Sequence, residues 1–244
     1  MSKKSKIPSN SSFTEGMLLS EDSPFSVKEA YKTLRTNVIF SLPGTECKCI
    51  GVTSATRGEG KSTIALNLAI SLAQLNKRVI LIDCDLRLPT ILTKLNLKNQ
   101  EGLSNYLSGM IDYIPVVRIK KRNIDIIPSG MIPPDATALI NSEEMLKMLK
   151  TLQKSYEFII FDFPPINIVS DAVLLSSEMD GYLIVAREGV SRFQQLIETF
   201  RQTRLVGAKI IGFVYNGKIE EKKMYKRKKY YGNYYYYNYY KKGY

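Results

Sequence analysis

Several common features are missing from this chain of 244 residues, which has no histidine, only three cysteines and no run of 18 apolar residues. The absence of histidine excludes imidazole bases, histidine-ligated zinc and serine-histidine triads, so any general base must be a carboxylate. Cys47, Cys49 and Cys84 are too few for a disulfide framework and are predicted to be reduced thiols. We expect neither a membrane-spanning helix nor a secretory signal, because the first 25 residues also lack a hydrophobic core.

Positive charge is concentrated at one end of the chain. The formal net charge is +12, and residues 218–244 hold nine Lys or Arg against Glu220 and Glu221, so seven of the twelve net charges lie there. An excess of this kind favours binding to polyanions. Because the rest of the chain carries only the remaining five, its body is not expected to bind nucleic acid.

Apolar runs alternate with helical patterns through most of the chain. Residues 1–25 are polar and are predicted to be a flexible leader. An amphipathic helix is predicted over 26–41, with Val27, Ala30, Tyr31, Leu34 and Val38 on one face. Strands are predicted over residues 49–54, 78–85, 123–129, 157–163, 181–187 and 209–215. Further helices are predicted over residues 61–77, 142–156 and 191–207.

The predicted strands are continuously hydrophobic, which indicates a sheet that is covered on both faces. Alternation of such strands with helices is typical of a parallel sheet with right-handed crossovers. The sequence therefore predicts an α/β fold over residues 26–217, with three layers and a mostly parallel central sheet.

A phosphate-binding loop is predicted in the segment ATRGEGKST, between a strand and a helix. It matches the P-loop pattern except that Ala55 stands where the first glycine is usual, so the predicted domain is P-loop NTPase-like. Gly58 and Gly60 allow the backbone N–H groups to converge on phosphate oxygens, and the following helix adds its positive dipole end. Lys61 is expected along the β- and γ-phosphates of ATP, with the Ser62 hydroxyl on Mg²⁺. The expected nucleotide-binding residues of the loop are Thr56, Arg57, Gly58, Glu59, Gly60, Lys61, Ser62 and Thr63.

Three carboxylates follow two of the buried strands. Asp83 and Asp85 end the run VILIDCD, and Asp162 ends FIIFD. Because ligands bind at the carboxyl ends of parallel strands, we expect these groups to converge beside the phosphate loop. One would hold Mg²⁺, and another could accept a proton from an attacking hydroxyl.

The last 20 residues, YKRKKYYGNYYYYNYYKKGY, hold ten of the sixteen tyrosines. Such a segment has no face to bury, so residues 218–244 are predicted to be a disordered tail. It could be a phosphorylation substrate or, since tyrosines mixed with Lys and Arg are typical of single-strand binders, a nucleic-acid-binding arm. The candidate phosphoacceptors are Tyr225, Tyr230, Tyr231, Tyr234, Tyr235, Tyr236, Tyr237, Tyr239, Tyr240 and Tyr244.

The phosphate loop, the two acidic strand ends and the tyrosine tail together resemble the bacterial tyrosine autokinases (BY-kinases). The resemblance is to the free-standing type associated with capsule and exopolysaccharide synthesis. Partition-type ATPases share the loop and the strand motifs, whereas the D-x-D-x-R pattern at Asp83, Asp85 and Arg87 and the tyrosine cluster separate the kinases from them. An ATPase that acts as an assembly switch stays an alternative.

The resemblance implies a role for each matching residue. Lys61 and Ser62 would bind phosphates and Mg²⁺, Asp83 would be the base, and Asp85 and Asp162 would serve the metal. Asn216 matches the position where related ATPases contact adenine.

The resemblance also implies partners. The family's ring contact is an E-x-x-R-x-x-R helix, which corresponds here to Glu29, Lys32 and Arg35. Lys32 departs from the pattern, and an ammonium cannot form the planar bidentate pair of a guanidinium. We expect a homo-oligomeric ring, a membrane adaptor that recruits the cytoplasmic chain to the inner face of the cell membrane, an opposing tyrosine phosphatase and no nucleic acid.

Overall fold

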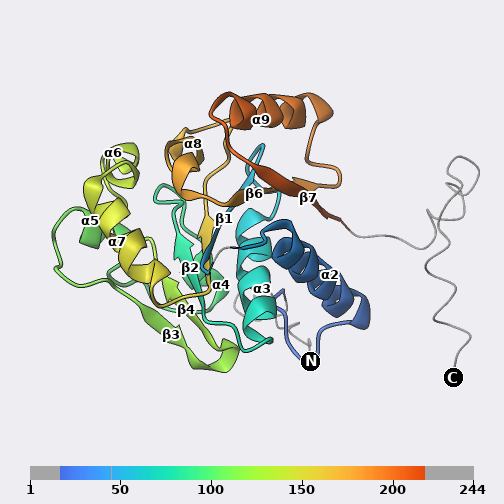
Figure 1. Ribbon diagram of the computed structural model, residues 1–244, viewed down its shortest axis with the longest axis horizontal. Helices are drawn as coiled ribbons and strands as arrows, with labels where there is room; N and C mark the ends of the chain where they lie inside the picture. The colour runs from blue at the N-terminus through green and yellow to red at the C-terminus, as the bar shows by residue number, and fades with distance from the viewer. Residues whose placement is uncertain (1–16, 45, 218–244) are drawn as a thin grey trace, which may run out of the picture.

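A seven-stranded sheet forms the centre of the computed structural model, which describes residues 17–44 and 46–217 (Figure 1). The strand order is β3-β4-β2-β5-β1-β6-β7, and every neighbouring pair is parallel except β3 with β4. The strands are β1 (Lys48–Ser54), β2 (Val79–Asp83), β3 (Val117–Ile119), β4 (Ile124–Ile127), β5 (Phe158–Asp162), β6 (Gly181–Arg187) and β7 (Ile210–Asn216).

Successive residues of the central strands enter two separate hydrophobic cores. In β2, Val79 and Leu81 belong to one core, whereas Ile80 and Ile82 belong to the other. A side-chain period of two makes this division inevitable when every residue of a strand is apolar. The prediction of a parallel sheet covered on both faces is confirmed.

Helices form the outer two layers. The first core is covered by α2 (Phe25–Ser41), α3 (Lys61–Ala73) and α4 (Ile91–Lys94). The second is covered by α5 (Leu103–Leu107), α6 (Ala136–Ile140), α7 (Glu143–Gln153), α8 (Asp171–Leu174) and α9 (Phe193–Leu205). Short 3₁₀ turns lie at η1 (Lys120–Arg122) and η2 (Ser176–Glu178). None of the helices in the described ranges is long and apolar enough to span a membrane.

Helix α7 shows how the sequence fixes a boundary. The Ser142 side chain accepts a hydrogen bond from the Met145 backbone N–H, and two glutamates occupy the first turn. Both features stabilise the N-terminus of a helix. The helix then buries an apolar stripe at Met145, Met148, Leu149 and Leu152.

Helix α2 matches the predicted span within a residue, but its apolar stripe is only partly buried. Val38 is buried, Tyr31 and Leu34 are half-buried, and Val27 and Ala30 are exposed. The helix lies at the border of the domain and packs mainly against α3, which leaves Phe25, Val27 and Ala30 exposed.

Two details of the sequence prediction need correction. Strand β3 and the short helices α4, α5, α6 and α8 were not predicted. The predicted flexible leader, residues 1–25, extends too far toward the C-terminus, because Leu18 and Leu19 are buried in the first core. The Asn67 side chain accepts a hydrogen bond from the Leu19 backbone N–H, which fixes this segment against α3. Residues 1–16 and the tyrosine tail lie outside the described residues.

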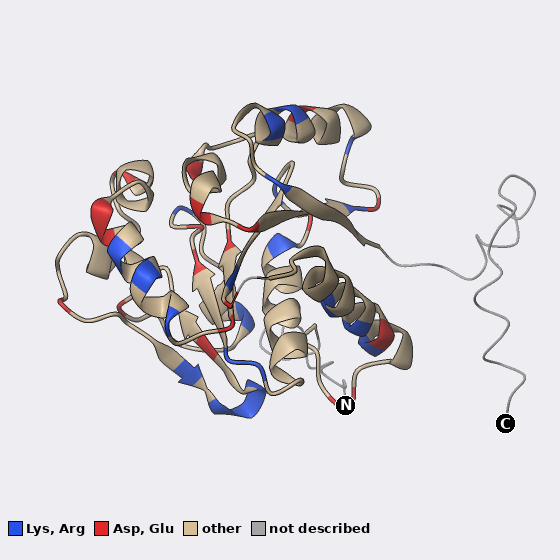
Figure 2. Cartoon of the chain, viewed as in Figure 1, with Lys and Arg blue, Asp and Glu red and all other residues tan. Residues whose placement is uncertain are grey.

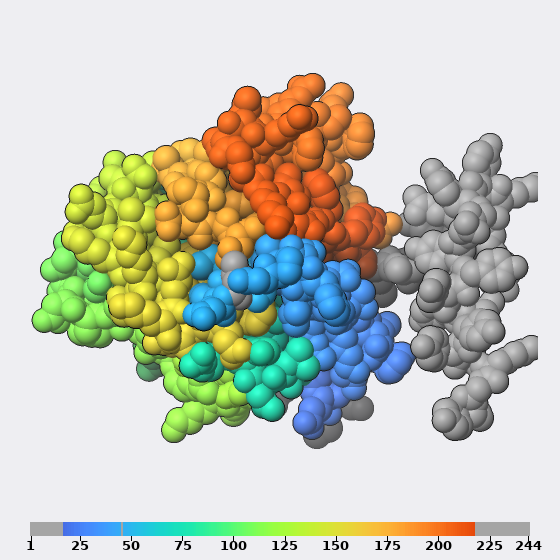
Figure 3. All heavy atoms as spheres, viewed as in Figure 1, coloured from blue at the N-terminus to red at the C-terminus, as the bar shows by residue number. Residues whose placement is uncertain are grey.

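The first helix and the last strand adjoin at one surface of the molecule (Figure 3). The Lys209 ammonium, just before β7, donates to the backbone carbonyl of Ser41 at the end of α2. Strand β7 then runs beside β6 to Asn216, and the chain leaves the sheet at the edge where the phosphate loop lies.

Candidate active site

The predicted phosphate loop connects β1 to α3 at the carboxyl edge of the sheet. Gly58 and Gly60 have φ angles of +81° and +94°, in the left-handed region that favours glycine. Helix α3 starts at Lys61, directly after Gly60. The loop therefore directs backbone N–H groups and a helix N-terminus to one place, which is a binding site for phosphate.

Side chains from β6, β7 and the segment before α9 hold this loop in place. The Arg187 guanidinium donates to the Gly58 carbonyl at 2.8 Å, and the Asn216 amide donates to the Glu59 carbonyl at 2.9 Å. The Glu59 carboxylate is fully buried and accepts from the Thr56 backbone N–H at 2.7 Å and from the Ser191 hydroxyl. Glu59 thus shapes the loop with its side chain, so that only its backbone N–H is left to contact a phosphate.

Lys61 lies among the three predicted carboxylates. Its ammonium is 2.8 Å from Asp85 Oδ2 and 3.5 Å from Asp162 Oδ1. Asp83 and Asp162 are partners in the pairing of β2 with β5, so their carboxylates follow neighbouring strands. The three carboxylates therefore lie close together beside the phosphate loop, as expected from the sequence.

Burial and mutual repulsion change the proton affinities of this cluster. Burial raises the pKa of the Asp83 carboxyl well above its usual range, and the charge of Asp162 raises it further. Burial also raises the pKa of Asp162, although the Lys61 charge offsets part of the effect. For Lys61, burial acts to lower the pKa, but the Asp162 and Asp85 carboxylates outweigh it and hold the pKa above the ordinary value.

Asp83 and Asp85 differ in their partners. Within the described part of the chain, Asp83 accepts two hydrogen bonds, both long, from the backbone N–H groups of Asp85 at 3.3 Å and Ile91 at 3.4 Å. Asp85 pairs with Lys61 and accepts from the Leu88 backbone N–H at 3.1 Å. The lone pairs of Asp83 are therefore the less engaged of the two.

The residues present suit a magnesium ion bound together with phosphates. Asp162 Oδ2 is buried and has no hydrogen-bond donor among the described residues. The described part of the chain contains no cluster of three or more Cys, Asp or Glu arranged to hold a metal by themselves. Mg²⁺ binds few protein carboxylates and completes its shell with water and phosphate oxygens. Ser62, Asp85 and Asp162 would supply the protein ligands.

The remaining predicted residues have varied surroundings. Asn216 contacts the loop backbone as described, at a position where a Cβ on Gly60 would lie only 2.3 Å from its amide nitrogen.

Glu29 and Lys32 form an exposed ion pair at 2.6 Å, and Arg35 donates to the Ser71 carbonyl of α3 at 2.8 Å. All three therefore have partners within their own chain, and the ring contact stays a prediction. The ten candidate phosphoacceptors lie outside the described residues.

A second charged network was missed by sequence reasoning. The Arg87 guanidinium donates to the fully buried Asp171 carboxylate of α8 and to the Thr137 hydroxyl of α6. Thr137 also donates to Asp171 at 3.1 Å. The D-x-D-x-R pattern singled out Arg87, but its partners are 50 and 84 residues away, and no local signal in the sequence identifies them.

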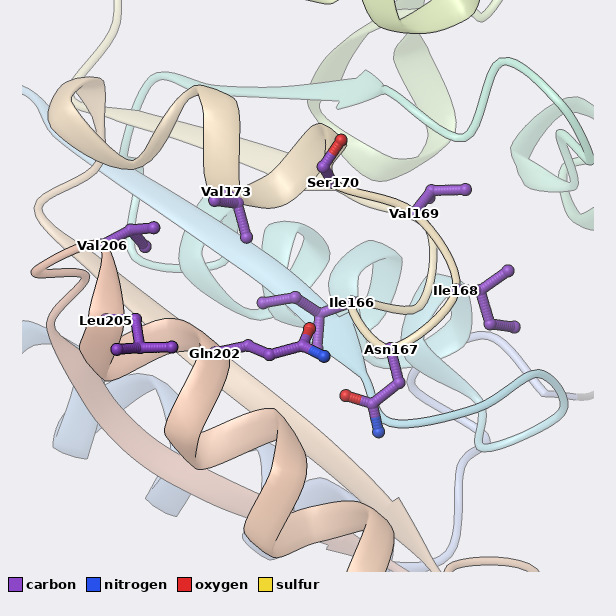
Figure 4. Close-up of a pocket in the computed structure, with 9 residues that line it drawn as sticks. All are labelled: Ile166, Asn167, Ile168, Val169, Ser170, Val173, Gln202, Leu205 and Val206. Atoms are coloured by element: carbon purple, nitrogen blue, oxygen red, sulfur yellow. The ribbon is translucent and has the colours of Figure 1, made fainter.

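An apolar cavity of about 410 Å³ is lined by none of the residues predicted to bind nucleotide or metal. It separates α9 from the segment that follows β5, and Figure 4 shows Gln202 and Leu205 facing Ile166 and Val173 across it.

A parallel sheet with a phosphate loop, a catalytic-type lysine and acidic strand ends defines a P-loop nucleotide-binding domain. Residues 47–209 match the family model described as an AAA domain. Among curated relatives, the tyrosine-protein kinase YwqD of Bacillus subtilis is 37% identical over 78% of this chain and 81% of its own length. The tyrosine-protein kinase CpsD of Streptococcus agalactiae is 34% identical over 80% of this chain and 84% of its own.

A solved structure agrees with these relatives. The kinase domain of Escherichia coli tyrosine kinase ETK superposes with a TM-score of 0.77 at 29% identity, covering 83% of each chain. The chain belongs to the bacterial tyrosine-protein kinases.

Ser191→Ala is expected to weaken nucleotide binding about three- to tenfold, because the buried Glu59 carboxylate loses one of its two donors and the loop loses a fixed shape. Isothermal titration of ATP in Mg²⁺ measures the effect. Ser191→Thr keeps the hydroxyl and should bind nearly as the original chain does. Equal affinity in the Ala and Thr variants would show that this hydrogen bond does not shape the loop.

Proposed function

We propose that the chain is an ATP-dependent tyrosine autokinase that phosphorylates its own C-terminal tyrosines, with each active site acting on the tail of a neighbouring subunit. One observation carries the proposal: a chain of the tyrosine-kinase family, with a phosphate loop and acids at one sheet edge, ends in ten closely spaced tyrosines. The family resemblance further implies that this activity regulates capsule and exopolysaccharide synthesis and export.

The reaction assigned to this site transfers the γ-phosphoryl group of ATP to a phenol. The tyrosine oxygen forms a bond to the γ-phosphorus, the bond to the oxygen that bridges the β- and γ-phosphates breaks, and ADP leaves with that electron pair. The phenolic proton passes to a carboxylate, for which we choose Asp83. Its raised pKa and weak hydrogen bonds suit a proton acceptor.

The chain's own residues position the phosphates and neutralise charge. Backbone N–H groups from Arg57 to Ser62 would bind the phosphate oxygens, and the Lys61 ammonium would bridge the β- and γ-phosphates. Lys61 is 12% exposed and already at the centre of the carboxylates, so its charge acts in surroundings where screening is weak. Mg²⁺, held by Ser62, Asp85 and Asp162, would supply further charge neutralisation at the transferring group.

Assembly and activation follow from the family resemblance. We infer a ring in which Glu29, Lys32 and Arg35 contact the next subunit, which requires Lys32 to leave its pair with Glu29. An exposed pair of this kind is worth at most about 1 kcal/mol, so the exchange costs little. A membrane adaptor would bring the chain to the inner face of the membrane, and a phosphatase would reverse the modification.

Intact-mass analysis after incubation with Mg-ATP tests the function. The purified chain is incubated with and without the cytoplasmic segment of its adaptor, and increments of one phosphate are mapped to residues. We expect phosphate only in residues 225–244. A variant with all ten tail tyrosines changed to Phe should gain none.

The matched control is Tyr113→Phe/Tyr215→Phe, which removes two exposed tyrosines of the folded body. It should be phosphorylated as the original chain is. Phosphate on the body tyrosines alone would contradict the assignment of the tail. ATP consumption without any mass change, with the adaptor bound, would identify a switch ATPase in place of a kinase.

A further inference from the structure

A cluster of basic residues lies at the end of the sheet that is farthest from the phosphate loop. We name it the basic edge; it comprises Lys77, Arg78, Arg118, Lys120, Lys121 and Arg122. Lys77 and Arg78 directly precede β2, and the others belong to β3 and the η1 turn that leads into β4. Pairing of Ile80 with Asp125 places these chain segments side by side, as Figure 2 also shows.

The basic edge carries more positive charge than its neighbours neutralise. Glu157 pairs with Lys77 at 2.8 Å and with Arg78 at 3.8 Å, and Asp125 pairs with Arg118 at 3.0 Å. Six cations against two carboxylates leave a surplus of four charges. Lys120 and Lys121 are exposed, and neither forms an ion pair within the described part of the chain.

The position of the edge separates it from catalysis. The phosphate loop and the carboxylates lie where the parallel strands end, whereas the basic edge lies where β2 and β4 begin. A partner held at this edge leaves the phosphate loop open. In addition, Arg122 donates to the Leu19 carbonyl, so the chain enters the folded body beside η1.

We propose that the basic edge docks directly on a membrane surface rich in anionic phospholipid headgroups. Four of its six residues, Arg78, Arg118, Lys120 and Lys121, are exposed, so the edge presents its charge at the surface, which suits a broad charged layer better than a particular acidic peptide. The cluster has no large exposed aromatic side chain for base stacking, which disfavours single-stranded nucleic acid. Its unpaired groups are lysine ammoniums on flexible stems, which suit a diffuse layer of negative charge. This contact goes beyond recruitment by an adaptor, because it needs no second protein.

Co-sedimentation of the full chain with vesicles tests the proposal. Vesicles of phosphatidylcholine alone are compared with vesicles that also contain phosphatidylglycerol. Each basic residue near an anionic surface contributes an appreciable attraction, so Lys120→Gln/Lys121→Gln should weaken partition into the anionic vesicles about tenfold or more. Both substitutions are at exposed positions and leave the tail unchanged.

The matched control is Arg201→Gln/Arg204→Gln, which removes the same charge from α9 at the opposite end of the molecule. It should change partition less than about twofold. Equal losses in the two variants would show that only total charge matters, and no binding of the original chain to anionic vesicles would overturn the proposal. Binding to polyglutamate that depends on Lys120 and Lys121, without vesicle binding, would assign the edge to an acidic protein segment. The measurement uses no ATP, so it is independent of whether the kinase proposal holds.

Discussion

Lys61→Met is expected to lower the initial rate of phosphotyrosine formation about 100- to 1,000-fold at saturating Mg-ATP. The lysine forms ion pairs with the acids at the phosphate loop, with its ammonium 2.8 Å from Asp85 and 3.5 Å from Asp162. Removing one preorganised group that stabilises charge in a transition state typically costs this much. Methionine preserves the length and most of the volume of the side chain, so the loss reports charge above all.

The control for this variant is Lys150→Met, at an exposed position on α7 far from the loop. It should keep the original rate. Circular dichroism of both proteins establishes that they are folded, because the Lys61 variant also leaves two buried carboxylates without their cation. An original rate in folded Lys61→Met protein would place the transfer chemistry elsewhere.

Arg87→Leu is expected to reduce the free energy of unfolding by about 3–5 kcal/mol. Asp171 is fully buried, and the guanidinium of Arg87 is its partner cation, supported by the shared Thr137 hydroxyl. Removing one partner of a buried ion pair leaves the other charge buried without a counter-ion, which strongly destabilises the folded state. Urea unfolding, followed by circular dichroism, measures the change.

The double variant Arg87→Leu/Asp171→Leu removes both charges and should recover part of the lost stability, which completes a double-mutant cycle. Arg118→Leu is the matched control, because its pair with Asp125 is exposed on the arginine side and should be worth less than about 1 kcal/mol. Equal destabilisation by the Arg87 and Arg118 variants would contradict a special role for the buried pair.

The sequence predicted those parts of the fold that short local patterns determine. Continuous apolar runs identified six strands, and glycines followed by Lys61 and Ser62 identified the phosphate loop. Strand β3 was not predicted because it is a three-residue edge strand with no fully buried side chain. Leu18 and Leu19 were not predicted to be buried, because two apolar residues in a polar stretch show no helical or strand periodicity. Only their contact with α3 shows that they belong to the core.

The sequence predicted the acids and the phosphate loop of the site, but not the side chains that hold them in position. Parallel topology alone placed Asp83, Asp85 and Asp162 together. The loop contacts of Arg187 and Ser191 join residues 129 and 132 positions apart, and the Asp171 partner of Arg87 is 84 positions away. Contacts of this range depend on the three-dimensional arrangement of β6, α8 and α9, which a single sequence does not encode in any local pattern.

The end of β7 beside the phosphate loop has a kinetic consequence. Asn216 contacts the loop, and Tyr225 follows nine residues later, within a maximum span of roughly 30 Å. In the proposed ring, the tail tyrosines of one subunit would be tethered to the same assembly as the neighbouring site, at an effective concentration of about the millimolar range that no longer depends on the bulk concentration of the protein. Competition by an added tyrosine peptide should accordingly be weak, and the rate per chain should level off once subunits have assembled. In this architecture, assembly and release of modified tails would control the output of the enzyme, and affinity for free tyrosine would contribute little.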